Sequence, residues 1–314
     1  MSPPTRRVLL VGGSSGIGRS VAVALGRRGD RVVVAARRAA LVEAVAAEAG
    51  PTATGLAVDA TDADRVHDLV AGAVRALGGL DTVVYAAGSS PLAPLADTGA
   101  TAWHDVLATN VVGAGLVVAA ATDHLRAGAD PTAVLLTSHS VGRPWPGLVP
   151  YAASKAALDE LVLGLRAEEP WLRVVRVVVG PTSTPFADQW DPADAESYFV
   201  RWADEGYLAH QVLGPDEVAT RLLAALVDPA SPDDVRAVGA TGGCATSGGA
   251  GRRPRLRGCR RPPGARPRWC SSRRRRRSTA RPPRPRRAHR PDRGRGVPPP
   301  RPRRPRGPSP WTRR

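Results

Sequence analysis

Two side chains capable of acid–base chemistry, Tyr151 and Lys155, stand four residues apart directly after Pro150. Positions i and i+4 share one face of a helix, so a helix over residues 151–168 would bring the phenol and the ammonium together. A phenol has an ordinary pKa of about 10, and a fixed cation beside it favours the phenolate and lowers that pKa. The pair therefore predicts that Tyr151 acts as a general acid in reducing a carbonyl, or as a general base in oxidising an alcohol.

Lys155 is the only lysine in the chain, because the other basic residues are all arginines. A compact ammonium that reaches a ribose hydroxyl and a phenolate is poorly replaced by a planar guanidinium. Every other basic position in the chain is arginine, so the single lysine indicates that position 155 specifically requires lysine. The alternative is that Lys155 is a surface residue of the helix whose retention has no functional reason.

Ser138 comes thirteen residues before Tyr151, at the end of an apolar run over 133–137 that predicts a buried strand. The carboxyl end of a parallel strand is the end at which ligands bind. We expect the Ser138 hydroxyl to hold a carbonyl oxygen against the phenol, with Ser140 and His139 as neighbouring alternatives. The Ser-His-Ser stretch suggests a hydrolase, but it does not form the G-x-S-x-G elbow of that class.

A glycine-rich turn over residues 12–18 (GGSSGIG) follows the apolar run 8–11 and leads into a helical pattern. Glycines let a pyrophosphate approach the backbone, and a helix N-terminus offers free N–H groups and the positive end of a dipole. The turn therefore predicts a dinucleotide-phosphate site, the alternative being an ordinary strand-to-helix turn. Arg37 and Arg38 follow the second apolar run, 32–36, where an NAD site would carry a carboxylate.

The two arginines favour NADP(H) over NAD(H), because guanidinium groups bind a 2′-phosphate through paired hydrogen bonds. The alternative is that the two arginines are a solvated pair on the surface.

Short apolar runs alternate with helical patterns along the chain. Strands are expected at 8–11, 32–36, 53–58, 81–86, 133–137, 174–179 and 235–238, and helices after the glycine turn and at 39–49, 62–77, 101–125, 151–168 and 216–226. This alternation predicts an α/β fold with a doubly wound parallel sheet.

Charge divides the chain at about residue 240. Residues 1–240 are mildly acidic, whereas residues 241–314 hold 26 arginines, 15 of the 31 prolines and one acidic residue, Asp292. We expect that tail to be disordered, because it has too little apolar surface to offset chain entropy. It could bind nucleic acid nonspecifically, be an extension without a function of its own, or be a frame-shifted end; we favour the last.

The cysteines and the apolar runs of the sequence bear on the cellular compartment and on membrane association. All three cysteines lie in the tail, so no disulfide supports the folded part, which suits a reducing compartment. The longest apolar run, 111–121, is shorter than the roughly 20 residues that a membrane span needs. The first residues have too short an apolar core for a signal peptide. We therefore expect a cytoplasmic protein without a membrane segment and, lacking any cysteine site, without a metal.

Residues 7–240 resemble the short-chain dehydrogenase/reductase family in the order and spacing of several motifs. These motifs are Gly12-x3-Gly16-x-Gly18, Asp59 after the third strand, Ala86-Ala87-Gly88, Asn110, Ser138, Tyr151-x3-Lys155 and Gly180-Pro181-Thr182. The resemblance implies a single Rossmann-type domain over residues 1–240 and an NADP(H)-dependent oxidoreductase. It also implies a homodimer or homotetramer built on the helices at 101–125 and 151–168.

The resemblance assigns roles to individual residues. Ser138 would orient the substrate oxygen, Tyr151 would transfer the proton, Lys155 would hold the nicotinamide ribose, and Asn110 would support a water relay to Lys155. The residues expected to contact the cofactor are Gly12, Ser14, Ser15, Gly16, Ile17, Gly18, Arg37, Arg38, Asp59, Ala87, Gly88, Tyr151, Lys155, Gly180 and Thr182.

Several positions depart from the family pattern. Val11 replaces the usual threonine, and Tyr85 and Ala86 replace asparagines, so we expect a weaker link between the cofactor loop and the fourth strand. The last strand is expected to be shortened or replaced where the tail begins. These departures leave open a second hypothesis, an inactive regulatory protein that binds a dinucleotide.

The substrate is expected to be a small carbonyl or alcohol, and the segment 185–210 bears on its shape. Six of the thirteen aromatic residues fall there: Phe186, Trp190, Tyr198, Phe199, Trp202 and Tyr207. Such a lid suits an apolar or ring-bearing substrate, with Trp145 as an opposite wall. The rings could equally serve only to pack the lid.

Overall fold

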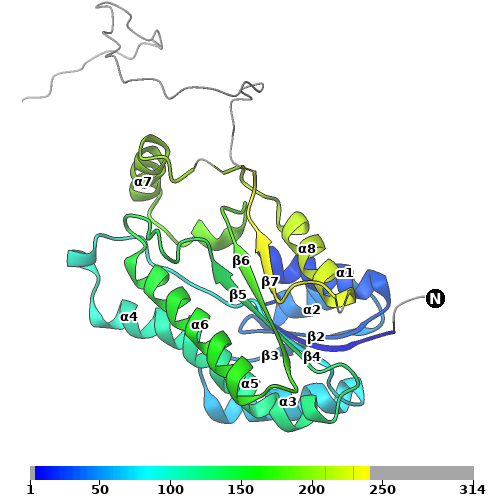
Figure 1. Ribbon diagram of the computed structural model, residues 1–314. Helices are drawn as coiled ribbons and strands as arrows, with labels where there is room; N and C mark the ends of the chain where they lie inside the picture. The colour runs from blue at the N-terminus through cyan, green and yellow to red at the C-terminus, as the bar shows by residue number, and fades with distance from the viewer. Residues whose placement is uncertain (1–3, 209, 229, 241–314) are drawn as a thin grey trace, which may run out of the picture. The chain divides into compact units, whose positions relative to one another are not determined.

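A computed structural model describes residues 4–208, 210–228 and 230–240. The expectations for the tail, 241–314, fall outside the described residues. Within them, seven parallel strands form one sheet in the order β3-β2-β1-β4-β5-β6-β7 (Figure 1). The strands are β1 (Arg7–Val11), β2 (Arg31–Ala36), β3 (Ala53–Ala57), β4 (Thr82–Tyr85), β5 (Thr132–Ser138), β6 (Arg173–Val179) and β7 (Asp234–Ala237).

Helices connect the strands and cover both faces of the sheet (Figure 1). They are α1 (Gly16–Arg28), α2 (Ala39–Ala49), α3 (Ala63–Leu77), α4 (Ala100–Leu107), α5 (Gly113–Arg126), α6 (Val149–Glu168), α7 (Pro192–Asp204) and α8 (Pro215–Val227). A π turn, Ala108–Val112, joins α4 to α5, and short 3-10 turns lie at Leu95–Asp97 and Pro185–Ala187. This is the doubly wound α/β fold that the alternating pattern predicted.

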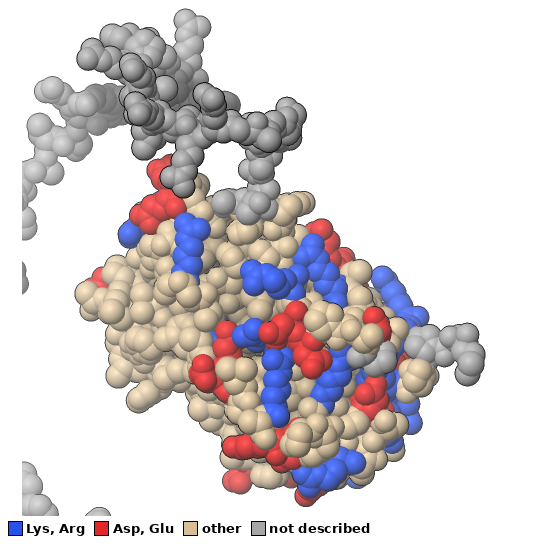
Figure 2. Space-filling view, in the orientation of Figure 1, with Lys and Arg blue, Asp and Glu red and all other residues tan. Residues whose placement is uncertain are grey.

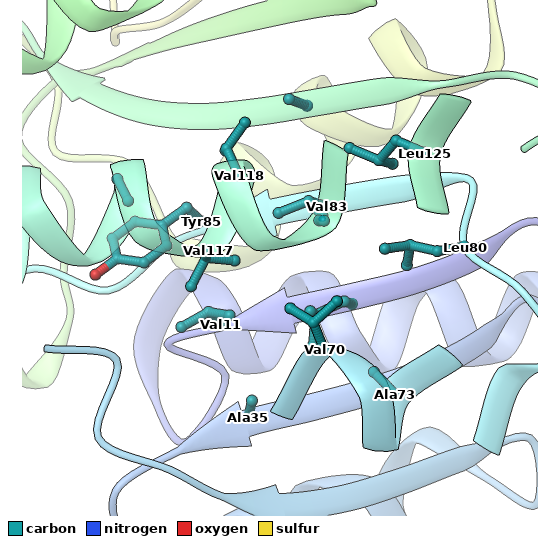
Figure 3. Packing of buried hydrophobic residues seen from close by; sticks show 14 of the residues in the cluster. Val11, Ala35, Val70, Ala73, Leu80, Val83, Tyr85, Val117, Val118 and Leu125 are labelled. Carbon is teal, nitrogen blue, oxygen red and sulfur yellow. The ribbon is translucent and has the colours of Figure 1, made fainter. Parts of the chain in front are cut away.

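The core divides into two apolar clusters, one on each face. In β1, Leu9 and Val11 face the cluster that holds α3, α5 and α6, while Val8 and Leu10 face the cluster of α1, α2 and α8. Figure 3 shows part of the first cluster, with Val117, Val118 and Leu125 of α5 packed over the sheet. Alternate residues serve opposite faces, which is why the parallel strands appear in the sequence as unbroken apolar runs.

The strand order reverses between β1 and β4, which are neighbours in the sheet. The chain runs outward through β2 and β3 on one side and through β5, β6 and β7 on the other. In such a sheet the carboxyl ends of the strands open a crevice at the point of reversal. The turn after β1 and the ends of β4 and β5 therefore meet at one edge.

Two features differ from the sequence expectations. The helix expected over 101–125 is broken by the π turn, and α7 lies in a segment to which the sequence analysis assigned only aromatic side chains. The strand expected at 235–238 is present as the four-residue β7, so it is short but not replaced. It pairs in parallel with β6 from Arg176 opposite Asp234 to Val179 opposite Ala237. The ion pair between the Arg176 and Asp234 side chains supports that pairing.

One helical stretch, Ala100–Arg126, has the length and mean hydropathy, 1.6, of a membrane span. Its apolar residues Val117, Val118, Ala121 and Leu125 are buried in the first core cluster. Burial accounts for part of that apolar composition, since 39% of the apolar window is buried.

Candidate active site

Tyr151 lies in the first turn of α6, and Ser138 is the last residue of the neighbouring strand β5. Pro150 at the start of α6 has the fixed φ that suits a first helical turn. The Ser138 hydroxyl accepts hydrogen bonds from the Ser140 backbone N–H at 3.1 Å and the Ser140 hydroxyl at 3.0 Å. Both serines thus belong to the site, with Ser140 holding Ser138 in place.

Burial raises the pKa of the Tyr151 phenol, and the Ser138 hydroxyl beside it opposes part of that rise. The sequence analysis expected the opposite direction, a pKa lowered by the Lys155 cation. In this structure the Lys155 Nζ lies 5.8 Å from the centroid of the Tyr151 ring. Desolvation of the phenolate therefore sets the direction of the pKa shift.

Lys155 is almost fully buried, with 4% of its surface exposed. Its Nζ donates a hydrogen bond to the Leu136 carbonyl at 2.8 Å. Burial lowers the pKa of Lys155 to about 8, and the nearby Asp159 carboxylate limits the decrease. The ammonium is thus a donor whose charge is lost within the neutral to mildly alkaline range.

Asn110 sits inside the π turn and is completely buried. Its Oδ1 accepts from the Ser89 N–H at 2.8 Å, and its Nδ2 donates to the Ser89 carbonyl at 3.0 Å and to the Ser154 Oγ at 2.9 Å. The Ser154 hydroxyl donates in turn to the Tyr151 carbonyl at 2.7 Å. Asn110 therefore joins the loop after β4 to the helix that carries Tyr151 and Lys155.

The glycine turn packs directly against the loop after β4. Gly12 has φ +89°, a left-handed conformation, and a Cβ there would lie 2.2 Å from the Ala87 nitrogen. Only glycine allows that approach. Helix α1 begins at Gly16, and the Ser15 side chain makes no capping hydrogen bond. The N–H groups of the first turn of α1 therefore have no side-chain cap and can bind an anion.

A cleft of about 520 Å³ opens at this edge of the sheet. Most of the residues expected to contact a cofactor line it together: Gly12, Ser14, Ser15, Gly16, Ile17, Gly18, Arg37, Arg38, Asp59, Ala87, Gly88, Tyr151 and Lys155. The size and the glycine turn fit a dinucleotide. Asn110 lies behind this lining, and Gly180 and Thr182 do not border the cleft.

The end of β2 gives the cleft a basic corner. Arg37 and Arg38 are exposed, and the Arg38 Nη2 donates to the Ser14 Oγ at 3.2 Å. Across the cleft, hydrogen bonds from Thr61 are the main reason that the pKa of Asp59 is below its usual value, and the Arg37 charge contributes. Two guanidinium groups and the hydroxyl of the glycine turn are thus gathered at one corner of the cleft.

A second cavity of about 250 Å³ adjoins the cleft, and its walls are mostly apolar. Gly180 and Thr182 lie here, together with Ser138, His139 and Ser140. The rings that line it are Trp145, Tyr151, Phe186, Trp190, Phe199 and Trp202. The Phe186 ring packs on the Tyr151 ring with their centroids 5.3 Å apart.

Two indole hydrogen bonds hold the wall of this cavity in place. Trp202 of α7 is 2% exposed, and its Nε1 donates to the Pro146 carbonyl at 3.0 Å. The Trp190 Nε1 donates to the Ser90 carbonyl at 2.9 Å. These rings therefore both pack the segment 185–210 and line the cavity. The two interpretations that the sequence left open, a wall for the substrate and packing of the lid, are thus compatible.

Sequence reasoning missed the groups that hold the site together. Ser89 and Ser154 bind Asn110, and the Leu136 carbonyl binds Lys155. A main-chain carbonyl carries no signal in a sequence. The position of Ser154, directly before Lys155, was the one available hint, because a buried polar side chain beside a buried lysine needs a partner.

Comparison with known proteins identifies relatives of this chain. The family model described as short chain dehydrogenase matches residues 6–195. The gluconate 5-dehydrogenase of Gluconobacter oxydans is 33% identical over 167 residues, which are 52% of this chain and 64% of that protein. The sorbitol dehydrogenase of Cereibacter sphaeroides is 30% identical over 194 residues, 61% of this chain and 75% of its own.

A third relative is far longer than this chain. The glycine betaine reductase of Emericella nidulans is 31% identical over 228 residues, 70% of this chain, and the match spans 17% of that protein.

Among solved structures, one described as a short chain dehydrogenase/reductase family protein is 29% identical, with a TM-score of 0.63. It covers 76% of this chain and 98% of its own. A short-chain dehydrogenase from Streptomyces avermitilis is 25% identical, with a TM-score of 0.63 over 74% of this chain and 88% of its own. The family match, the shared fold and the motifs gathered at one sheet edge agree: this chain belongs to the short chain dehydrogenase family of oxidoreductases.

Proposed function

We propose that this protein is an NADP(H)-dependent oxidoreductase that interconverts a carbonyl and an alcohol, with Tyr151 as the general acid or base. One observation carries the proposal: Tyr151 lines both the dinucleotide-sized cleft and the adjoining apolar cavity. A proton donor at that boundary can reach a substrate oxygen on one side while a nicotinamide occupies the other. The nicotinamide, when bound, supplies or accepts the hydride.

The other residues have distinct tasks. Ser138, with its hydroxyl fixed by Ser140, orients the substrate oxygen toward the phenol. Lys155 holds the nicotinamide ribose. In its charged form, its ammonium group also favours the phenolate form of Tyr151. Asn110 holds the serine framework beside Lys155 and supports the water relay that the family resemblance implies.

The basic corner of the cleft supports NADP(H) as the preferred cofactor. Arg37 and Arg38 stand where a carboxylate would favour the ribose hydroxyls of NAD(H). Arg38 already contacts the Ser14 hydroxyl, so little rearrangement would be needed to bind a 2′-phosphate. Preorganised donors bind such a group at a lower entropic cost.

The substrate that fits the apolar cavity is an apolar or ring-bearing ketone or alcohol. Aromatic walls favour such a molecule, and the volume suits a small one. Ser138 and Tyr151 are the polar groups aligned for the reacting oxygen. The Trp190 and Phe186 rings that line the cavity would exclude water from the reaction.

The quaternary state and location are also proposals. We place the catalytic unit at residues 1–240 and expect a cytoplasmic homodimer or homotetramer. The surface over α4 and α6 carries few charged side chains (Figure 2). Val112 and Leu163 are about half exposed, at 50% and 48%. Light scattering in solution measures this assembly directly.

The first experiment is a titration of the full-length protein with NADPH and with NADH, in high salt so that the arginine-rich tail cannot mimic binding. We expect tighter binding of NADPH. A panel of ketones and alcohols then tests turnover, with Tyr151→Phe as the decisive variant. This variant should bind NADPH as the wild type does and lose turnover by about 10²–10⁴-fold.

Unchanged turnover in Tyr151→Phe would show that the proton comes from elsewhere. Binding of NADPH without turnover of any substrate would favour the inactive, regulatory alternative. A folded protein that binds neither nucleotide would contradict the enzyme proposal.

A further inference from the structure

The π turn between α4 and α5 leaves one carbonyl without its usual helical partner. In a regular α-helix the Gly113 N–H would donate to the Thr109 carbonyl, four residues earlier. Here it donates to the Ala108 carbonyl, five residues earlier. The Thr109 carbonyl instead accepts a hydrogen bond from the Tyr85 hydroxyl at 2.6 Å. A side chain from the sheet has thus replaced a helical hydrogen bond.

Tyr85 ends β4 and is 1% exposed. It lies opposite Val11 of β1 in the sheet register, and Figure 3 shows the ring beside Val11 and Val117. Burial, with the Asp59 charge adding to it, raises the pKa of Tyr85 well above its ordinary range, so the hydroxyl stays protonated. The phenol is therefore a permanent donor to Thr109.

Gly113 provides the space that this hydrogen bond needs. A Cβ at Gly113 would lie 2.4 Å from the Tyr85 hydroxyl oxygen and 2.9 Å from the Ala60 carbonyl oxygen. Two residues later, a Cβ at Gly115 would meet nothing within 4 Å. The two glycines differ in environment although both lie in the first turn of α5, which makes them a matched pair.

The turn that Tyr85 holds carries Asn110, the residue directly after Thr109. The Asn110 side chain uses its three hydrogen bonds to fix Ser89 and Ser154. A regular helix would rotate Asn110 about its axis, because each residue added or removed in a turn shifts the following side chains by about 100°. The position of Asn110 thus depends on the turn staying open.

We propose that Tyr85 is a positioning residue: its hydroxyl holds the π turn open and so keeps Asn110 against Ser89 and Ser154, beside Lys155. The consequence for turnover rests on the proposed function, but the consequence for the turn does not.

Tyr85→Phe tests the hydroxyl while keeping the ring. We expect kcat to fall about tenfold, the rate equivalent of one lost positioning hydrogen bond, while the substrate KM changes less than about twofold. Amide hydrogen exchange should accelerate across 109–114 and stay unchanged in α3. Gly113→Ala should show the same pattern, whereas Gly115→Ala should behave as the wild type does.

A double-mutant cycle links the two positions. Because Tyr85→Phe removes the oxygen that the new methyl would meet, the combined variant should lose less kcat than the product of the single losses. Wild-type kcat and exchange in Tyr85→Phe would overturn the proposal, as would a Gly115→Ala variant that is impaired as much as Gly113→Ala. If the wild type itself shows no turnover, the proposed function fails, and hydrogen exchange alone decides whether Tyr85 holds the turn.

Discussion

The Nζ of Lys155 donates its hydrogen bond to the carbonyl of Leu136, 2.8 Å away, from a position that water hardly reaches. Burial lowers the pKa of this lysine from 10.5 to about 8. A folded-state pKa below the unfolded value means that the unfolded chain binds the proton more tightly. The charged lysine therefore weakens the fold below pH 8, and this cost is relieved as the pH rises toward 10.5.

This relation predicts a pH-dependent difference between the wild type and Lys155→Met, both without nucleotide. The free energy of unfolding of the wild type relative to the variant should rise by roughly 3 kcal/mol between about pH 8 and pH 10.5, at 1.36 kcal/mol for each unit of pKa shift. Urea denaturation across that range measures it, and the other titrating groups cancel in the comparison. A difference that is independent of pH would mean that Lys155 keeps an ordinary pKa.

Ser138 and Ser140 are expected to respond differently to replacement by alanine. Ser138→Ala removes the hydroxyl that orients the substrate oxygen, so kcat should fall about 10²-fold or more. Ser140→Ala removes one donor to Ser138, and kcat should fall less than about tenfold. Steady-state kinetics with one ketone decides between them. The reverse order would move the orienting role to Ser140, the alternative that the sequence raised.

Arginine at the end of β2 should set the cofactor preference. Arg37→Ala and Arg38→Ala should each raise the NADPH KM by about 10- to 100-fold, because each removes a charged hydrogen bond to the 2′-phosphate. The NADH KM should change less than about twofold. Arg27→Ala, an exposed arginine at the end of α1 that lies outside the cleft, is the control. An equal loss with both nucleotides would argue against 2′-phosphate recognition.

The Phe186 ring should set the preference for ring-bearing substrates. It packs on Tyr151 and lines the apolar cavity, so Phe186→Ala should raise the KM of an aryl ketone about tenfold. A short aliphatic ketone should be affected less. Val227→Ala, at the exposed end of α8, should change neither KM. An equal rise in both KM values would show that the ring serves the lid and not the substrate.

The sequence by itself determined the layers of the fold and predicted which groups react. Buried parallel strands need unbroken apolar runs, and amphipathic helices need a 3.6-residue period, so both leave local signatures. All seven strands and the helices α1, α2, α3, α6 and α8 followed from these signatures to within a few residues, whereas α4 and α5 were expected as one helix. Tyr151 and Lys155 were predicted as a pair in the same way, because that prediction needs only the spacing of one helical turn.

Tertiary structure decided what those groups touch. Tyr85 meets Thr109 across 24 residues, and Trp190 meets Ser90 across 100, through the stacking of sheet, π turn and lid. No local period encodes such contacts, since they depend on which strands become neighbours. The same holds for the pKa of Tyr151: sequence spacing placed a cation nearby and predicted a decrease, whereas three-dimensional burial of the phenol raised it.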